Sequence, residues 1–305
     1  MLALVVAVAL HGALQGPSLV RDSALPLSGR RILLCSPRVE AAAQASSLLL
    51  AGIRPIWCPA VSVQPLTDCS ALDDKLMRLA EYDVFVVQST HAIDAVAERW
   101  LSLADGSLEL VAAMLEASSV EIGAVGADAL HFRRALGVPV SIAPIEPSAR
   151  ALAATLHDLG HAGPGKRILV ASGQADANLG ESPLELAALL EELKLVGAMA
   201  EHIRTHDVVP CTRDAIAPEL SLLRDGLVDA VCVGSPEEMR ALAAAAEWPS
   251  GGAMQPVIVA LGDEVAAAAA SIAPDADVLN LGARPANEVI VTALEAHFGA
   301  GKLLF

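Results

Sequence analysis

Aromatic residues are scarce in this sequence, with 4 Phe, 3 Trp and 1 Tyr among 305 residues. Proteins that bind single-stranded nucleic acids stack the bases on aromatic side chains, so this class is disfavoured. Basic residues are also few, because 20 Lys and Arg stand against 36 Asp and Glu and give a net charge of −16. Such a chain repels phosphate backbones, and we expect no nucleic-acid partner. The acidity is interpreted as a solvated surface.

The sequence also lacks the short motifs of common enzyme classes. It has no GxGxxG, GxxxxGK[ST], HExxH or GxSxG pattern, so nothing indicates a dinucleotide-binding dehydrogenase, a kinase, a zinc protease or a serine hydrolase. The five cysteines include no CxxC pair, which disfavours a disulfide framework and favours a reducing compartment. His157 and His161 have helical spacing, but Gly160 marks a helix end there, and we interpret them as a surface pair rather than a metal site.

No apolar run is long enough to span a bilayer. The longest candidate, Leu2–Leu10, is too short, and it lacks the basic region that opens a signal peptide. Residues 1–27 are therefore left open as a weak signal, a remnant of a targeting segment or a packed arm. We expect no membrane partner.

What the chain does contain is an internal repeat. A turn, a basic pair and a short apolar run occur at Gly29–Leu34 and again at Gly165–Val170. Such runs are typical of buried parallel strands. Two further strand pairs follow in the same order, each closed by Ser or Gly: Tyr82–Ser89 with Val228–Ser235, and Val120–Gly126 with Pro256–Gly262.

Helical segments alternate with these strands in both copies. The predicted helices are Val39–Leu50 with Pro183–Val196, Leu72–Ala80 with Ile216–Leu223, and Pro147–Leu156 with Pro285–Leu294. A further strand in each copy is predicted at Arg54–Val63 and at Ala198–Val209. Alternating strands and helices over 305 residues predict an α/β fold with two similar parallel-sheet lobes.

Ligands of parallel sheets bind at the carboxyl ends of the strands. Ser89, Gly126, Ser235 and Gly262 stand at those ends. The helices that begin there present backbone N–H groups and a partial positive charge, which suit anions. The alternative interpretation is that the serines are only helix caps and the glycines only turns.

The order of these motifs resembles the uroporphyrinogen-III synthase family from Leu27 to Phe298. The opening strand is Ile32–Pro37, and the pattern of Asp, four apolar residues, one more residue and Ser occurs at Asp83–Ser89 and Asp229–Ser235. The resemblance implies cyclisation of hydroxymethylbilane with inversion of the last pyrrole ring and loss of water. It implies a lyase of tetrapyrrole biosynthesis, for heme or chlorophyll, that uses no cofactor and no metal.

The resemblance also implies how the chain is wired. Lobe 1 would comprise 28–62 plus 207–305, lobe 2 would comprise 63–206, and two extended connectors near Pro65 and Pro210 would leave a cleft between the lobes. The implied partner is the small-molecule substrate, which the deaminase that makes it could hand over. The implied protein is a monomer in the cytoplasm or the plastid stroma.

Carried over residue by residue, the resemblance assigns substrate binding to the strand ends. The residues are Ser89, Thr90, His91, Gly126, Ala127, Ser235, Pro236 and Gly262, with Arg38 in place of an Arg that the family has at Ser36. The family's Tyr, a suggested proton donor, aligns with His206, and a histidine could donate a proton near neutral pH. The family's two Thr are replaced by Ala129 and Val265.

These replacements leave other functions open. One alternative is a catalytically inert synthase-like module that binds an anionic tetrapyrrole or another small ligand. A second is a bilobal small-molecule binder like the periplasmic binding proteins, which would require a cleaved export signal.

Overall fold

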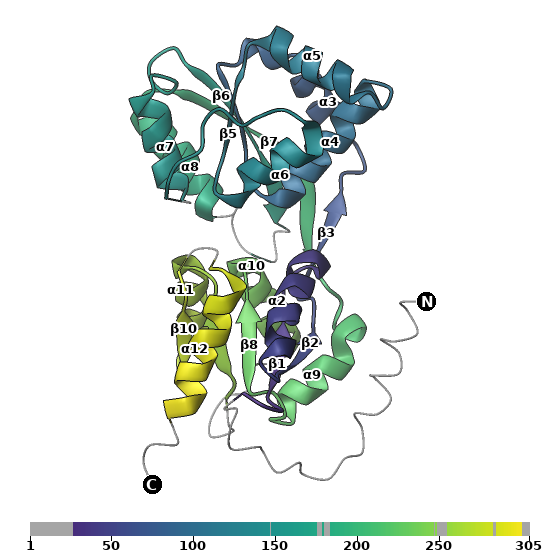
Figure 1. Cartoon of the computed structure of the whole chain (residues 1–305), viewed down its shortest axis with the longest axis vertical. Coiled ribbons are helices and arrows are strands. Elements are labelled where there is room, and N and C mark those ends of the chain that lie inside the picture. The colour runs from purple at the N-terminus through teal and green to yellow at the C-terminus, as the bar shows by residue number, and fades with distance from the viewer. Residues whose placement is uncertain are drawn as a thin grey trace.

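The computed structural model describes residues 27–146, 148–175, 179, 184–246, 248, 255–282 and 285–300. These ranges form two lobes, each built on one five-stranded sheet (Figure 1). Residues 1–26, with the apolar run Leu2–Leu10, lie outside the described ranges, as do Pro147 and Pro183 of two predicted helices. No helix within the described ranges is long and apolar enough to cross a membrane.

The first lobe contains sheet A, in the order β10-β9-β8-β1-β2, with all neighbours parallel. Helices α2 and α12 pack on one face of it, and α9, α10 and α11 pack on the other. Its elements are β1 (Arg31–Leu34), α2 (Arg38–Leu50), β2 (Arg54–Trp57), η3 (Arg213–Ile216), α9 (Ala217–Arg224), β8 (Ala230–Val233), α10 (Pro236–Ala246), β9 (Val257–Ala260), α11 (Asp263–Ile272), β10 (Val278–Asn280) and α12 (Asn287–Ala300).

The second lobe contains sheet B, in the order β3-β7-β6-β4-β5, in which only the β3–β7 pair is antiparallel. Helices α7 and α8 pack on one face, and the other helices of the lobe pack on the opposite face. Its elements are β3 (Val61–Pro65), α3 (Ser70–Met77), η1 (Leu79–Glu81), β4 (Val84–Val87), α4 (Thr90–Leu103), α5 (Leu108–Ser118), β5 (Glu121–Ala124), α6 (Ala127–Leu136), α7 (Ala149–Asp158), β6 (Arg167–Ala175), α8 (Leu184–Leu195) and β7 (Met199–Pro210).

The two sheets confirm the predicted repeat and the predicted fold class. Sheet A contains the run β9-β8-β1-β2, and sheet B contains β5-β4-β6-β7, which places corresponding strands in the same order. Each sheet combines strands from both copies, because β1 of the first copy pairs with β8 of the second, and β4 of the first pairs with β6 of the second. Each lobe therefore contains half of the first copy of the repeat and half of the second copy.

Ion pairs between the two copies explain the repeated polar residues at the strand starts. In sheet A, Asp229 accepts from the Arg31 backbone N–H at 2.8 Å and from the Arg30 guanidinium at 2.6 Å. In sheet B, Asp83 accepts from the Arg167 N–H at 2.9 Å and from the Lys166 ammonium at 2.8 Å. The basic pair of each copy thus meets the aspartate of the other copy and sets the register of the central strands.

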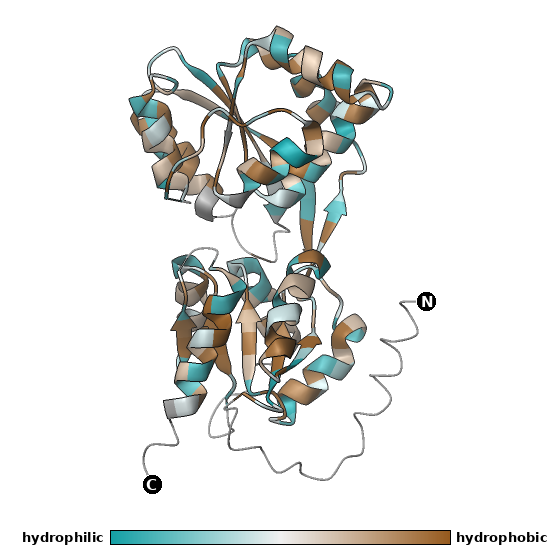
Figure 2. Cartoon of the chain, viewed as in Figure 1, coloured by the Kyte–Doolittle hydropathy of each residue, from teal (hydrophilic) through white to brown (hydrophobic). Residues whose placement is uncertain are grey.

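The central strands are apolar along their whole length because helices cover both faces of each sheet. All four residues of β4 and all four of β8 are fully buried, and Figure 2 shows the interior of both lobes as hydrophobic. In sheet B, Trp100 packs edge-on against Phe85 and Phe132. With Tyr82, four of the eight aromatic residues of the chain lie in this core.

The prediction of one continuous strand at Arg54–Val63 is wrong, because the structure has two strands there. This stretch forms β2 in sheet A and β3 in sheet B, with the segment around Pro59 between them. Proline lacks the backbone N–H that a continuous strand requires, so the chain leaves one sheet here and enters the other. β3 then pairs with the end of β7, from Val61 opposite Pro210 to Pro65 opposite His206. The strands of sheet A lie within 31–57 and 230–280, and those of sheet B lie within 61–210.

A second contact crosses between the lobes. Leu179 follows β6 of the second lobe, yet its side chain is buried in the hydrophobic core of the first lobe with Cys35 and Met239. Its carbonyl oxygen accepts a hydrogen bond of 2.9 Å from the Arg240 guanidinium of α10. The lobes are therefore connected by an apolar side chain as well as by strands.

Truncation of Leu179 tests this contact. Leu179→Ala is expected to lower the free energy of unfolding by about 2–5 kcal/mol, because it removes buried methyl groups from a packed core. Chemical denaturation measures the change. Leu159→Ala, at an exposed leucine of the second lobe, is the control and is expected to change stability by less than about 0.5 kcal/mol. Equal effects of the two variants would contradict the contact.

Candidate functional site

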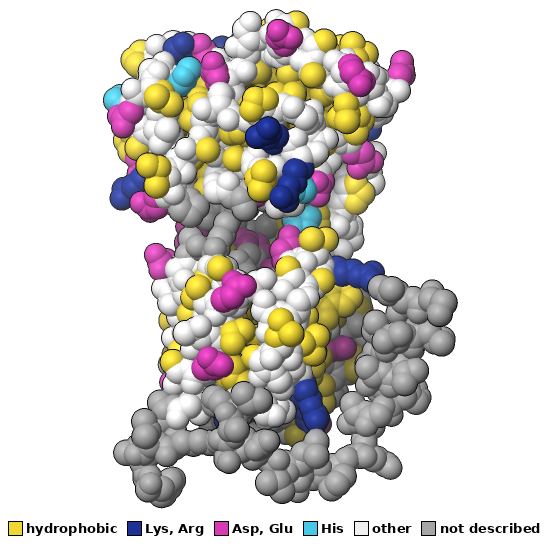
Figure 3. Space-filling view, in the orientation of Figure 1, with side chains coloured by type: hydrophobic (Ala, Val, Ile, Leu, Met, Phe, Trp, Pro, Cys, Tyr) yellow, Lys and Arg dark blue, Asp and Glu magenta, His cyan; other side chains and the backbone are white. Residues whose placement is uncertain are grey.

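The starts of α2 and α4 approach each other where the lobes meet. His91 is the second residue of α4, and its Nε2 lies 3.7 Å from Oε1 of Glu40 in α2. The space-filling view shows histidine next to acidic side chains in this region (Figure 3). Both helices follow the carboxyl end of a parallel strand, which is where ligands of such sheets bind.

The N-terminus of α4 already holds a carboxylate of the chain itself. Asp128, 2% exposed, accepts from the Ser89 backbone N–H at 3.2 Å and from the Thr90 hydroxyl at 3.4 Å. The Ser89 hydroxyl caps the helix by accepting from the Ala92 N–H at 3.3 Å. The predicted cap is confirmed. The predicted substrate contact at Ser89 and Thr90 stays a prediction, and a substrate carboxylate would compete there with Asp128.

The N-terminus of α10 has a similar arrangement in the first lobe. Glu238 accepts from the Gly234 N–H at 2.7 Å and from the Ser36 hydroxyl at 3.3 Å. The Ser235 hydroxyl accepts from the Glu238 N–H at 3.2 Å, which confirms Ser235 as a cap. This is close to a capping box, in which the side chains of the first and fourth residues satisfy each other's backbone N–H groups. Ser36 thus binds an internal acid.

Burial raises the pKa of Glu238 to about 7, although the Gly234 and Ser36 hydrogen bonds act in the opposite direction. The nearby carboxylates of Glu40 and Glu237 raise it further by charge repulsion. Near neutral pH this side chain therefore exists partly as the neutral acid. A group with such a pKa at the end of a strand can take up or release a proton.

A β-bulge determines the position of His206. Ser172 of β6 pairs with Arg204 of β7, but Gln174 pairs with Asp207, so β7 contains one extra residue. The bulge turns the imidazole of His206 onto Gly173. A Cβ atom at Gly173 would lie 2.7 Å from Cδ2 and 2.8 Å from Cε1 of that ring. Only glycine leaves room for this placement.

The surroundings of His206 favour its neutral form. Burial lowers its pKa to about 4, and the proximity of His91 lowers it further, while Asp207 has the opposite effect. Its Nδ1 lies 2.9 Å from the Thr205 hydroxyl. The assignment of His206 as the proton donor stays a prediction, and the lowered pKa favours a neutral ring near pH 7. A neutral imidazole can still donate or accept a hydrogen bond.

A second histidine of β7, His202, lies near His206. Together with Ser172 and Thr205, the two histidines form what we call the polar strip of sheet B. His202 Nε2 lies 2.9 Å from the hydroxyl of Ser172, and burial lowers the pKa of His202. The strip therefore contains two neutral imidazoles and two hydroxyl groups along the central strands of sheet B. Ser172, Thr205 and His206 are buried, and His202 is the partly exposed member of the strip. The described residues contain no cluster of three or more His, Cys, Asp or Glu that could hold a metal ion.

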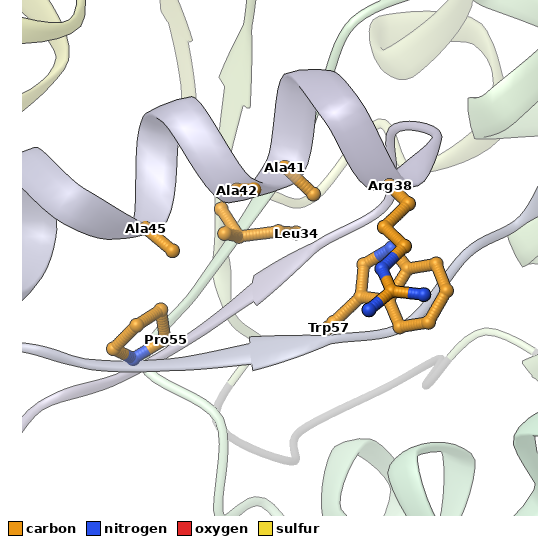
Figure 4. Close-up of a pocket in the computed structure, with 7 residues that line it drawn as sticks. All are labelled: Leu34, Arg38, Ala41, Ala42, Ala45, Pro55 and Trp57. Atoms are coloured by element: carbon orange, nitrogen blue, oxygen red, sulfur yellow. The ribbon is translucent and has the colours of Figure 1, made fainter. Parts of the chain in front are cut away.

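The remaining predicted residues do not gather at one point. Arg38 is exposed at the start of α2 and lies beside the Trp57 ring, at a groove of about 190 Å³ between α2 and the edge strand β2 (Figure 4). Gly126 precedes α6, whose first residue is Ala127, and the side chain of Ala127 lies outside the described part. Pro236 is buried as the first residue of α10, and Gly262 precedes α11.

The sequence-based assignment lacks several residues of this region, which are Glu40, Asp128, Ser172, Gly173, His202, Thr205 and Glu238. The role of Glu238 could have been predicted from the sequence, since a Glu three residues after the cap Ser235 has the spacing of a capping box. No sequence pattern could have indicated Asp128, Glu40 or Gly173, because their contacts are with residues of other helices and strands.

Comparison with known proteins confirms the resemblance. The family profile described as uroporphyrinogen-III synthase HemD matches residues 42–279. A mutant uroporphyrinogen III synthase from Thermus thermophilus is 16% identical, with a TM-score of 0.57 over 88% of this chain and 100% of that chain. Uroporphyrinogen-III synthetase from Helicobacter pylori is 12% identical, with a TM-score of 0.49 over 88% and 99% of the respective chains. No curated protein matches the sequence.

At these identities the Thermus structure shows the fold, while the profile shows the family. The profile covers well over half of the 305 residues, and its range takes in strands of both sheets. The chain therefore belongs to the uroporphyrinogen-III synthase HemD family.

Proposed function

We propose that this chain is a uroporphyrinogen-III synthase, which cyclises hydroxymethylbilane with inversion of the last pyrrole ring and loss of water. Membership of the family is the observation that carries this proposal. The hydrogen-bonding groups at the sheet tips are consistent with it, because the reaction depends mainly on holding a flexible substrate in one conformation.

The chemistry requires little from the protein beyond orientation and one proton transfer. The substrate loses its own hydroxyl group, and the protein must direct which carbon of the last ring is attacked. His91 and His202, which are partly exposed, can offer hydrogen bonds to pyrrole N–H groups and carboxylates. Enzyme groups that are fixed before the reaction stabilise developing charge without reorganising.

A coupled assay tests the proposal. Porphobilinogen and its deaminase generate hydroxymethylbilane, and the products are oxidised and separated by liquid chromatography. Spontaneous closure yields the type I isomer, so the chain is expected to convert most of the flux to type III. The matched control is the same reaction with heat-denatured protein.

Production of type I alone, at concentrations where the chain is fully folded, would contradict the proposal. Measurable binding of a tetrapyrrole in that case would indicate the inert binding module instead.

A further inference from the structure

Two neighbouring histidines differ in their access to a bound molecule. The ring centroids of His91 and His206 are 5.9 Å apart, and the ring planes are tilted by 53°. His206 is only 5% exposed, with one nitrogen at the Thr205 hydroxyl and the ring against Gly173. The side chain of His91 is 28% exposed. His91 is therefore the imidazole of the pair that a substrate can reach.

The carboxylate next to His91 comes from the other lobe. Glu40 Oε1 lies 3.7 Å from His91 Nε2, and Glu40 Oε2 is buried without a hydrogen-bond partner among the described residues. A carboxylate next to an imidazole can orient the ring. Since Glu40 lies in the first turn of α2 and His91 in the first turn of α4, this support depends on the approach of the two lobes.

We propose that His91 is the catalytic proton donor to the departing hydroxyl and that Glu40 is its positioning residue, so that the acid is assembled from both lobes. The inference rests on the proposed synthase function. It differs from the sequence-based assignment, in which His206 donates the proton and His91 only binds substrate. His206 is then a neutral neighbour whose ring centroid lies 5.9 Å from that of His91.

The proton balance closes over one turnover. A proton moves from the His91 ring to the hydroxyl oxygen, the carbon–oxygen bond breaks, and water leaves. The electron pair of the pyrrole nitrogen stabilises the resulting cation. For the inverted product, the cation bonds to the substituted α-carbon of the last ring, the bond from that carbon to its original methylene bridge breaks, and the bridge bonds to the free α-carbon of the same ring. That carbon then loses one proton, which returns to the His91 ring.

A double-mutant cycle with His91→Gln and Glu40→Gln tests the assignment in the coupled assay. His91→Gln is expected to lower kcat about 100-fold, in the range of general acid catalysis, with KM changed less than about threefold. Glu40→Gln is expected to lower kcat about 10-fold. The double variant should be no slower than His91→Gln alone, because Glu40 acts only through His91.

The chain offers a matched control pair. His131 Nε2 lies 2.6 Å from Asp94 Oδ1, but both residues belong to the second lobe and lie on its surface. His131→Gln and Asp94→Asn are expected to leave kcat unchanged. Melting temperatures of all variants separate loss of folding from loss of chemistry. If Glu40→Gln does not fold, Glu40→Asp replaces it and is expected to retain more than a tenth of the wild-type kcat.

Three results would overturn the inference: additive losses in the cycle, an unchanged kcat in His91→Gln, or an effect on KM alone. A wild-type chain that forms no type III isomer would overturn the proposed function and the inference together. A wild-type chain that forms type III while both variants keep full kcat overturns the inference only.

Discussion

Replacing Gly173 with alanine is expected to lower the rate of type III formation at least 100-fold and to destabilise the fold by about 1–3 kcal/mol. The added Cβ would lie within 2.8 Å of two carbon atoms of the His206 ring. The backbone can shift little, because β6 pairs with β4 up to Ala171 and with β7 at Ser172 and Gln174, on both sides of Gly173. His206 must therefore leave its position, and the polar strip is lost.

Two companion variants make this test specific. Gly123→Ala alters another glycine of sheet B, where the atom nearest to the Cβ would be in the Val86 side chain at 3.2 Å, with Val84 at 3.8 Å and the Ile142 carbonyl oxygen at 3.9 Å. It is expected to cost stability but to preserve activity. Gly173→Ala combined with His206→Ala removes the ring that the Cβ would strike, so the double variant should be more stable than Gly173→Ala alone. A fully active Gly173→Ala variant would contradict the placement of His206.

The second large effect concerns stability and pH. Burial raises the pKa of Glu238 from 4.5 to about 7, so the folded chain keeps a proton that the unfolded chain releases between these values. The free energy of unfolding therefore falls as the pH rises from about 4.5 to about 7. The full loss, present above pH 7, is on the order of 3 kcal/mol. Glu238→Gln removes it while keeping the shape of the side chain.

We expect Glu238→Gln to be more stable than the wild type at pH 8 and equally stable near pH 4.5. Denaturation midpoints of both chains at several pH values measure the difference. His206 acts in the opposite direction, since its lowered pKa removes stability as the pH falls from 6.5 to about 4, but this contribution cancels between the two chains. Glu109→Gln, at an exposed helix start, should gain nothing at pH 8. A Glu238→Gln chain that is less stable at pH 8 would contradict the argument.

Local sequence signals predicted the scaffold well. The apolar runs that end in Ser89 and Ser235 became fully buried strands, and both serines cap the helices that follow. The repeat of basic pair and aspartate predicted matching strands, and the ion pairs of Asp83 and Asp229 show why both copies keep these residues. Such features depend on neighbours in the chain or on a pattern that occurs twice.

The site depended on contacts that no local pattern encodes. His206 reaches its position through a bulge opposite Gly173, and the register of β6 and β7 is a tertiary property. Asp128 and Glu40 meet their partners across different helices. The pKa shifts could not be predicted from the sequence either. The low pKa of His206 and the high pKa of Glu238 both result from burial in the folded chain.

The central claim is that one tetrapyrrole contacts the tips of both sheets at once. Amide hydrogen exchange with and without uroporphyrinogen III under reducing conditions tests it directly. We predict slower exchange at the start of α2 around Glu40, at the start of α4 around His91, and along β7 near His206. Protection confined to one lobe, or found only at the outer groove of Arg38 and Trp57, would contradict a site assembled between the lobes.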